Sequence, residues 1–268
     1  MRYKVVLEYD GTNYGGWQKQ KDKLGIQEVI EECVFLFSGE KVEVVASGRT
    51  DTGVHAINQT VHFDLTKKYE EGVVVNALNF WFGKRNRNII LEWQKQNNNH
   101  FSKPFLQQDI VAKDCKIVDN DFHARFSSKM RYYKYIILNR KAPSALWQNK
   151  AWHIRKKLNI EKMQEASKFI LGNHDFSSFR DSQCQAKSPI KTMSSCNIYK
   201  ESEELIIFEF SAKSFLYHMI RNIVGTLRDV GIGKITVENF KEILEAKDRR
   251  MAGEMAAACG LYLVNIDY

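Results

Sequence analysis

The residues with the clearest potential for chemistry lie in the stretch GRTDTGVHA, residues 48–56. It places Asp51 two positions after Arg49, on a predicted turn between two strands. A carboxylate can act as a nucleophile or a base, and a neighbouring guanidinium favours its ionised form. Gly48 and Gly53 would let the backbone turn tightly and let a substrate come close. The stretch is therefore the first candidate for a catalytic site, with His55 at its rim.

Three interpretations of Asp51 compete. Asp and Thr between two strands often cap a turn through side-chain bonds to the backbone, so Asp51 could be structural. Asp-Thr-Gly also occurs in aspartic proteases, which need two carboxylates sharing one proton. Only one such triplet is present, so a dimer partner would supply the second, and Arg49 would oppose the raised pKa that proton sharing requires. The third interpretation is an ionised nucleophile or base held beside Arg49.

Composition and charge narrow the class of protein. The chain has 268 residues, of which 44% are hydrophobic and 27% charged, enough for one large globular domain or two ordinary ones. Lys and Arg number 40 against 32 Asp and Glu, and the resulting net charge of +8 favours a polyanionic partner.

The cysteines and the apolar segments indicate the compartment. There are 5 cysteines without a C-x-x-C pair, which argues against a disulfide framework or a zinc ribbon and favours buried thiols in a reducing cytoplasm. The N-terminus has no apolar core for a signal peptide, and no apolar stretch approaches the roughly 18 residues that span a bilayer. We therefore expect a cytoplasmic protein without a membrane segment.

Hydrophobic periodicity predicts the elements that position these residues. The predicted strands are 3–9, 41–47, 59–65, 109–118, 131–138, 190–200, 204–212 and 260–266. The predicted helices are 25–37, 72–82, 159–172, 215–231 and 237–247. Each half thus has the order β-α-β-β-α-β of the ferredoxin-like motif, with one extra helix in the second half.

This order predicts an α+β fold of two ferredoxin-like halves, each with helices on one face of a mostly antiparallel sheet. The expected domains are 1–120, which carries the Asp51 loop, and 121–268. A cleft between two such halves is the natural place for a site.

Six segments resemble one known family, the bacterial tRNA pseudouridine synthase A family. GRTDTGVHA is similar to its catalytic loop. The other five are YDGTNYGGWQKQ (9–20), FHARFSSKMRYYKYIIL (122–138), LGNHDFSSFR (171–180), FLYHMIRNIVG (215–225) and GLYLVNIDY (260–268). The matches occur in order along the chain. The resemblance implies two ferredoxin-like halves with a basic cleft between them, working as a homodimer.

The resemblance also implies an activity. The expected enzyme is an isomerase that converts uridine to pseudouridine at positions 38, 39 and 40 in the anticodon arm of tRNA. It needs no metal or cofactor, which suits a chain without metal-ligand spacing. Asp51 would attack the ribose or the ring, or assist loss of a ribose proton; all three routes need its ionised form and stay open. The target base must leave its stack to be reached.

Three further residues complete the expected site, as substrate-binding groups: Tyr133, Arg49 and Arg221. The Tyr133 ring would stack on the extruded uracil, and its phenol would serve in proton transfer at C5. Tyr133 shares a strand face with Tyr135, but periodicity does not show which face is core. Arg221 lies in an apolar helix, where a charge is costly unless paired. We expect it near the Asp51 carboxylate or a tRNA phosphate; a solvated edge is the alternative.

Several features leave room for other readings. Basic runs occur at 84–87, 125–134 and 155–157, where they could follow a tRNA backbone or simply be solvated. Residues 81–108 look longer than the family's usual connection, and 253–260 lacks an expected proline. A catalytically silent RNA-binding protein on the same scaffold is the alternative function; the Asp51 and Arg49 pair favours the enzyme.

Overall fold

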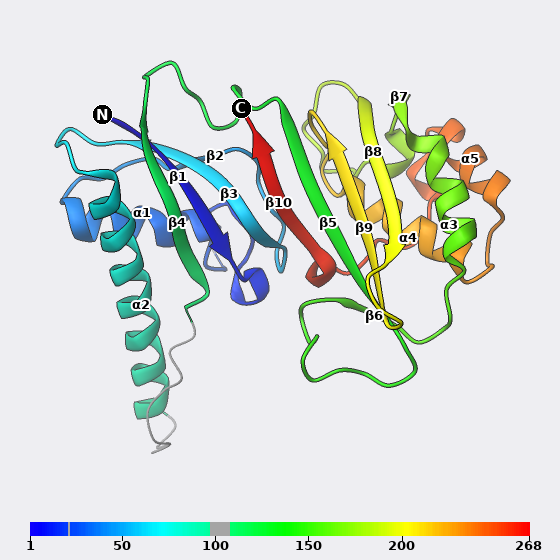
Figure 1. The fold of residues 1–268 in the computed structure, drawn as a ribbon, viewed down its shortest axis with the longest axis horizontal. Helices are drawn as coiled ribbons and strands as arrows, with labels where there is room; N and C mark the ends of the chain where they lie inside the picture. The colour runs from blue at the N-terminus through cyan, green and yellow to red at the C-terminus, as the bar shows by residue number, and fades with distance from the viewer. Residues whose placement is uncertain (21, 97–107) are drawn as a thin grey trace. The chain divides into compact units, whose positions relative to one another are not determined.

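The computed structural model describes residues 1–20, 22–96 and 108–268, and for 86–96 it describes the backbone alone. Within this part, the chain forms five α-helices and a mixed set of strands, which confirms the predicted α+β class. It divides into two compact units, Met1–Ser128 and Lys129–Tyr268. Figure 1 shows the elements of both units, and each unit is described by itself.

The first unit contains four strands and two α-helices. In chain order they are β1 (Arg2–Tyr9), α1 (Ile26–Ser38), β2 (Val45–Ala46), β3 (His55–Asp64), α2 (Glu71–Gln96) and β4 (Ile110–Val118). The strands lie in the order β4-β1-β3-β2 and all pairs are antiparallel. Val5 at the centre of β1 pairs with Val61 on one side and Cys115 on the other.

The core of the first unit follows from its sequence periods. Every second residue of β1 is buried, which gives the strand one apolar face. On α1 the buried residues are Ile26, Val29, Ile30, Cys33 and Val34, a single helical stripe. The helix ends at Ser38, one residue past its predicted end, because Gly39 takes a left-handed φ of 77° and donates its backbone N–H to the Phe35 carbonyl at 2.8 Å.

The second unit has six strands and three α-helices. They are β5 (Met130–Asn139), β6 (Trp152–Ile154), α3 (Ile160–Ser167), β7 (Gly172–Asp175), β8 (Ile190–Lys200), β9 (Leu205–Ala212), α4 (Met219–Gly231), α5 (Val237–Ala246) and β10 (Leu261–Asp267). The strand order is β10-β5-β9-β8-β7, with antiparallel pairs, and β6 pairs with β5 in parallel. Helix α3 packs against β8, and α5 packs against α3 (Figure 1).

Helix α4 is central to this unit, because every one of its residues except Arg228 is buried. It packs against α3 and α5. Asn159 caps the N-terminus of α3: its side chain accepts a hydrogen bond from the Lys162 backbone N–H at 2.8 Å.

Several predicted boundaries were wrong. The strand at 41–47 is reduced to Val45–Ala46, which pairs only with β3 at the edge. The helix at 72–82 continues to Gln96, because 83–96 holds many good helix formers and no proline. The helix at 159–172 ends at Ser167, before a 3-10 turn and the strand β7. The helix predicted from residue 215 begins at Met219.

The long segment at 81–108 is only partly described, since residues 97–107 lie outside the described part. None of the helices in the described ranges is both long and apolar enough to cross a membrane.

Candidate active site

Asp51 lies on the turn that joins β2 to β3. The Val54 backbone N–H donates to the Asp51 carbonyl at 3.1 Å, and Gly53 takes a φ of 79°, which side-chain-bearing residues rarely adopt. Asp51 is half-buried, Arg49 is exposed, and His55 is buried at the start of β3. The turn thus keeps the Asp51 carboxylate near the surface, while Thr50 and Val54 on either side of it are buried.

Buried polar side chains of neighbouring strands hold the Asp51 turn in place through hydrogen bonds. The Tyr9 hydroxyl of β1 lies 2.8 Å from the Thr50 hydroxyl. The Gln59 amide of β3 donates to the Gly48 carbonyl at 2.7 Å and accepts from the Ser47 hydroxyl at 2.7 Å. Leaving one such buried group without a partner costs about 1–3 kcal/mol. Displacing the turn would break several of these bonds at once, so the backbone around Asp51 is fixed in position.

The N-terminal motif YDGTNYGGWQKQ also forms hydrogen bonds with the Asp51 turn and with His55. The Trp17 backbone N–H donates to the Thr50 carbonyl at 2.9 Å, and the buried Trp17 ring packs near Tyr9. The Gly11 backbone N–H donates to His55 Nδ1 at 3.1 Å, and an Asp10 carboxylate oxygen lies 3.0 Å from the same nitrogen. An Nδ1 without a proton can accept from the Gly11 N–H, whereas an Nδ1 with a proton can donate to the Asp10 carboxylate. The tautomer of His55 therefore decides which of the two hydrogen bonds forms.

Gly16 lies close against the Asp51 turn. Its φ is 95°, and a Cβ there would lie 2.7 Å from the Thr50 carbonyl oxygen and 3.0 Å from the Asp51 carbonyl carbon. Sequence analysis did not single out this residue. The sequence feature that could have indicated it is the Gly15-Gly16 pair in the N-terminal motif. The fold shows why this motif occurs together with the Asp51 stretch: Gly16 lies against the Asp51 turn.

Tyr133 lies on β5 in the second unit. Tyr135 on the same strand face is fully buried, and Ile136 and Leu138 on the opposite face are buried as well, so β5 is covered on both faces beyond Tyr133. Tyr133 itself is half-buried, and its ring meets the edge of Phe215 at a centroid distance of 5.1 Å. Tyr132 points the other way and donates its hydroxyl to Asp267 at 2.7 Å; this hydrogen bond raises the pKa of Tyr132. The two neighbouring phenols therefore have different surroundings.

Arg221 lies in the first turn of α4. It is 9% exposed, which excludes the solvated edge considered from the sequence. Its Nε donates to the Ala256 carbonyl at 2.9 Å, and the Ala256 backbone N–H donates to the Arg221 carbonyl at 3.1 Å. Such hydrogen bonding offsets part of the cost of burying a guanidinium in an apolar helix. Its expected contact with the Asp51 carboxylate or a tRNA phosphate stays a prediction.

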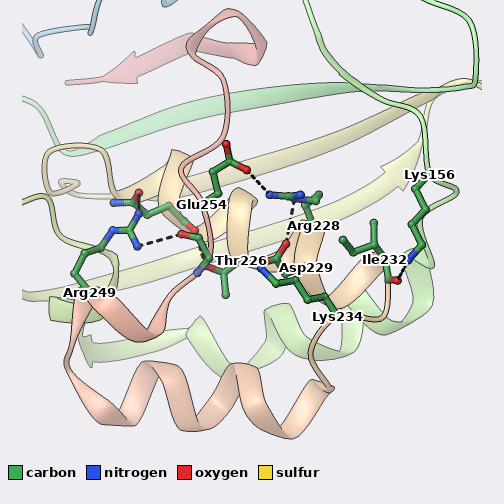
Figure 2. Close-up of polar contacts among 10 residues, drawn as sticks. Lys156, Thr226, Arg228, Asp229, Ile232, Lys234, Arg249 and Glu254 are labelled. Atoms are coloured by element: carbon green, nitrogen blue, oxygen red, sulfur yellow. Dashed lines mark hydrogen bonds and ion pairs between the residues drawn. The ribbon is translucent and has the colours of Figure 1, made fainter.

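The segment that carries Ala256 is bound along α4, as Figure 2 shows. Arg249 donates to the Asn222 side chain at 2.9 Å, and the Gly253 backbone N–H donates to the Thr226 hydroxyl at 3.0 Å. Arg228 pairs with Glu254 at 3.0 Å. These bonds fix the carbonyl that orients Arg221.

The candidate residues fall into two groups. Arg49 and Asp51 share one loop of the first unit, whereas Tyr133 and Arg221 belong to the second unit. Arg49 is exposed and Asp51 half-buried, and the ion pair that the sequence suggested between them stays a prediction. Across the same ranges, no cluster of three His, Cys, Asp or Glu side chains could hold a metal ion.

The basic runs differ in whether their side chains form ion pairs with acidic residues of this chain or are exposed. Arg85 pairs with Glu32 at 3.0 Å and Lys134 with Glu201 at 3.2 Å. Arg155 and Lys157 are exposed. The side chain of Arg87 lies outside the described residues.

Comparison with known proteins identifies the class. Residues 5–126 and 166–268 match the family model described as tRNA pseudouridine synthase. Proteins named tRNA pseudouridine synthase A from Orientia tsutsugamushi strains Ikeda and Boryong are each 42% identical, over 292 and 295 residues that cover both chains completely. The chain is therefore an isomerase, as predicted. More narrowly, it belongs to the tRNA pseudouridine synthase family, which confirms the resemblance seen in its six motifs.

Proposed function

We propose that this chain converts uridine to pseudouridine in tRNA, at positions 38, 39 and 40 of the anticodon stem-loop, with Asp51 as the catalytic residue and without a cofactor. One observation carries the proposal. In a chain of this family, Asp51 is a half-buried carboxylate on a turn that β1, β3 and the N-terminal motif all hold in place. Such a fixed position is what a group attacking one atom of a substrate needs.

The reaction moves one bond and balances without a co-reactant. The bond from C1′ of the ribose to N1 of uracil breaks, the base turns, and a bond from C1′ to C5 forms. C5 then loses its proton and N1 gains one, so the product is an isomer of the substrate. An ionised carboxylate at Asp51 would serve as the nucleophile, either at C1′ or at the ring, or would assist loss of a ribose proton.

The other residues have proposed roles that fit their surroundings. The Tyr133 ring, fixed by Phe215, would stack on the extruded uracil while its phenol takes part in proton transfer at C5. The exposed Arg49 would contact the RNA backbone beside Asp51. Arg221, oriented by the Ala256 carbonyl, would hold the Asp51 carboxylate or a phosphate.

We extend the proposal to fold and assembly. The order β-α-β-β-α-β and the strand order β4-β1-β3-β2 of the first unit support a ferredoxin-like half. The second unit supports the same core with additions, namely β6, β7 and one extra helix. A basic cleft, a homodimer and a cytoplasmic location complete the proposal, in line with the net charge of +8 and a tRNA substrate.

The activity is tested by incubating the purified protein with an unmodified tRNA transcript and mapping pseudouridine. Product at positions 38, 39 and 40 is the expected result. Binding without any pseudouridine would favour the catalytically silent RNA-binding protein.

Binding to tRNA should depend strongly on salt. If the exposed basic residues contact phosphates, log K should fall linearly with log salt, with a slope of about −0.7 to −0.9 per contact. Replacing Arg155 and Lys157 by Ala should then reduce the slope, whereas Lys241→Ala, which removes a lysine paired with Glu245, should not. Fluorescence anisotropy over a salt series measures this. A flat salt response would show that the basic runs are only solvated surface.

Gly16→Ala should impair catalysis by moving the Asp51 turn. The added Cβ would lie 2.7 Å from the Thr50 carbonyl oxygen, and alanine would be strained at a φ of 95°. We expect a kcat reduced on the order of 10²-fold, because small misplacements of catalytic groups have effects of that size.

Gly39→Ala is the matched control, since Gly39 also has a positive φ, of 77°, but nothing lies within 4 Å of its Cβ position. It should cost about 1–2 kcal/mol of stability and leave kcat unchanged. Equal kcat in the two variants, measured below their melting temperatures, would show that Gly16 does not position the turn.

A further inference from the structure

The turn at 122–128 in the first unit holds an aromatic ring out from the surface. The Ser127 backbone N–H donates to the His123 carbonyl at 2.9 Å, and the His123 backbone N–H donates to the Ser127 hydroxyl at 2.9 Å. His123 Nδ1 accepts from the backbone N–H groups of Arg125 and Phe126, at 3.1 and 3.2 Å. Four hydrogen bonds thus fix a turn only a few residues long, and with it the direction of the Phe126 side chain.

Phe126 is 76% exposed, yet its ring has a fixed neighbour. The His123 ring lies against it with centroids 4.3 Å apart and planes 31° from parallel. On its inner side His123 meets the edge of His62, at 4.9 Å. The three rings form a row that runs from solvent to the buried His62 on β3.

The inner end of this row is firmly anchored. His62 is 5% exposed, and its Nδ1 accepts from the Ala124 backbone N–H at 3.2 Å. Burial lowers the pKa of His62 to about 4, with a further contribution from the charge of Arg2. His62 is therefore uncharged near pH 7. At the outer end of the row, the guanidinium carbon of the exposed Arg125 lies 5.9 Å from the Phe126 centroid.

Exposure alone does not distinguish Phe126, because Leu146 is 90% exposed and single exposed apolar residues are common. The difference is that Phe126 combines a highly exposed ring, a second ring packed against it and a neighbouring guanidinium. Proteins bind unpaired bases of RNA with this combination, since a base stacks on the ring while cations attract its phosphates.

We propose that Phe126, backed by His123 and flanked by Arg125, stacks against an unpaired base of the substrate tRNA. The proposal rests on the proposed function and adds a binding contact to it. Stacking requires only a π face, so the contact would contribute affinity and orientation with little base preference. The net charge of +8 favours RNA over a second copy of this equally basic chain as the occupant.

The test compares four variants in binding to an unmodified tRNA transcript by anisotropy. Phe126→Ala and Phe126→Leu both lose the aromatic face and should raise Kd by about 5- to 150-fold, the effect of one lost base stack. Phe126→Trp keeps the face and should bind within a few-fold of wild type. Leu146→Ala removes exposed apolar surface elsewhere and should leave Kd unchanged. Circular dichroism checks folding, and light scattering on the same samples measures the mass.

Each possible result of this test either supports or contradicts the proposed stacking contact. Wild-type affinity in Phe126→Leu would show that the contact is apolar packing and not stacking. A monomer mass in Phe126→Ala, with a dimer in wild type, would make Phe126 a contact between copies of the chain. Wild-type Kd in Phe126→Ala, from a wild-type protein that does modify tRNA, would overturn this inference and leave the proposed function intact. A wild-type protein that forms no pseudouridine would instead refute the proposed function.

Discussion

Asp51→Asn is expected to abolish pseudouridine formation, with a loss on the order of 10⁴-fold or more, as when an enzyme loses its nucleophile. The amide has nearly the same shape as the carboxylate and serves turns equally well. The bonds that hold the turn involve Thr50, Gly48 and the Asp51 carbonyl, so the substitution leaves them in place. The neutral amide cannot act as nucleophile or base. Folding and tRNA affinity should stay close to wild type.

The measurement is pseudouridine formation on unmodified tRNA, with circular dichroism and a binding assay on the same samples. Asp119→Asn is the control for the loss of one negative charge, since Asp119 is an exposed carboxylate of the same unit. It should retain full activity. An Asp51→Asn protein that still forms pseudouridine would assign Asp51 to the turn alone.

Tyr133→Phe should lower turnover by about 10²- to 10⁴-fold, the usual worth of a positioned proton-transfer group. The ring and its edge contact with Phe215 remain, so stacking on the base and tRNA binding should survive. The loss should therefore appear in kcat and not in Kd, as single-turnover kinetics and anisotropy measure them.

Tyr132→Phe is the matched control on the neighbouring position. The Tyr132 phenol donates to Asp267, and its loss should cost about 1 kcal/mol of stability without lowering turnover. Wild-type turnover in Tyr133→Phe would leave this residue only a stacking or packing role.

Periodicity predicted the α+β class and most long elements, because β1, α1 and α5 each bury one regular face. Periodicity failed for short strands that form only because they pair with a neighbouring strand. β6 and β7 have only three and four residues and exist through pairing with β5 and β8. The extension of α2 was missed because polar residues there carry no apolar stripe, although they form helices readily.

The candidate site shows the same limit. The types and spacing of Arg49 and Asp51 indicated that the loop could be catalytic. The apolar neighbours of Arg221 indicated that its charge would need a partner, but a solvated edge stayed open as the alternative. The sequence around Asp51 did not show that Gln59 and Gly16 hold the Asp51 loop in place, because each of these residues contacts the loop from a distant position in the chain. The expected Arg49–Asp51 pair was inferred from two-residue spacing alone and stays a prediction, although the structure shows that Arg49 is exposed.

The central claim, a tRNA pseudouridine synthase that uses Asp51, is tested most directly by mapping pseudouridine on one unmodified tRNA transcript incubated in parallel with wild type and Asp51→Asn. Our account predicts pseudouridine at positions 38, 39 and 40 with the wild-type protein and none with the variant. Pseudouridine formed equally by both proteins, or by neither, would contradict it.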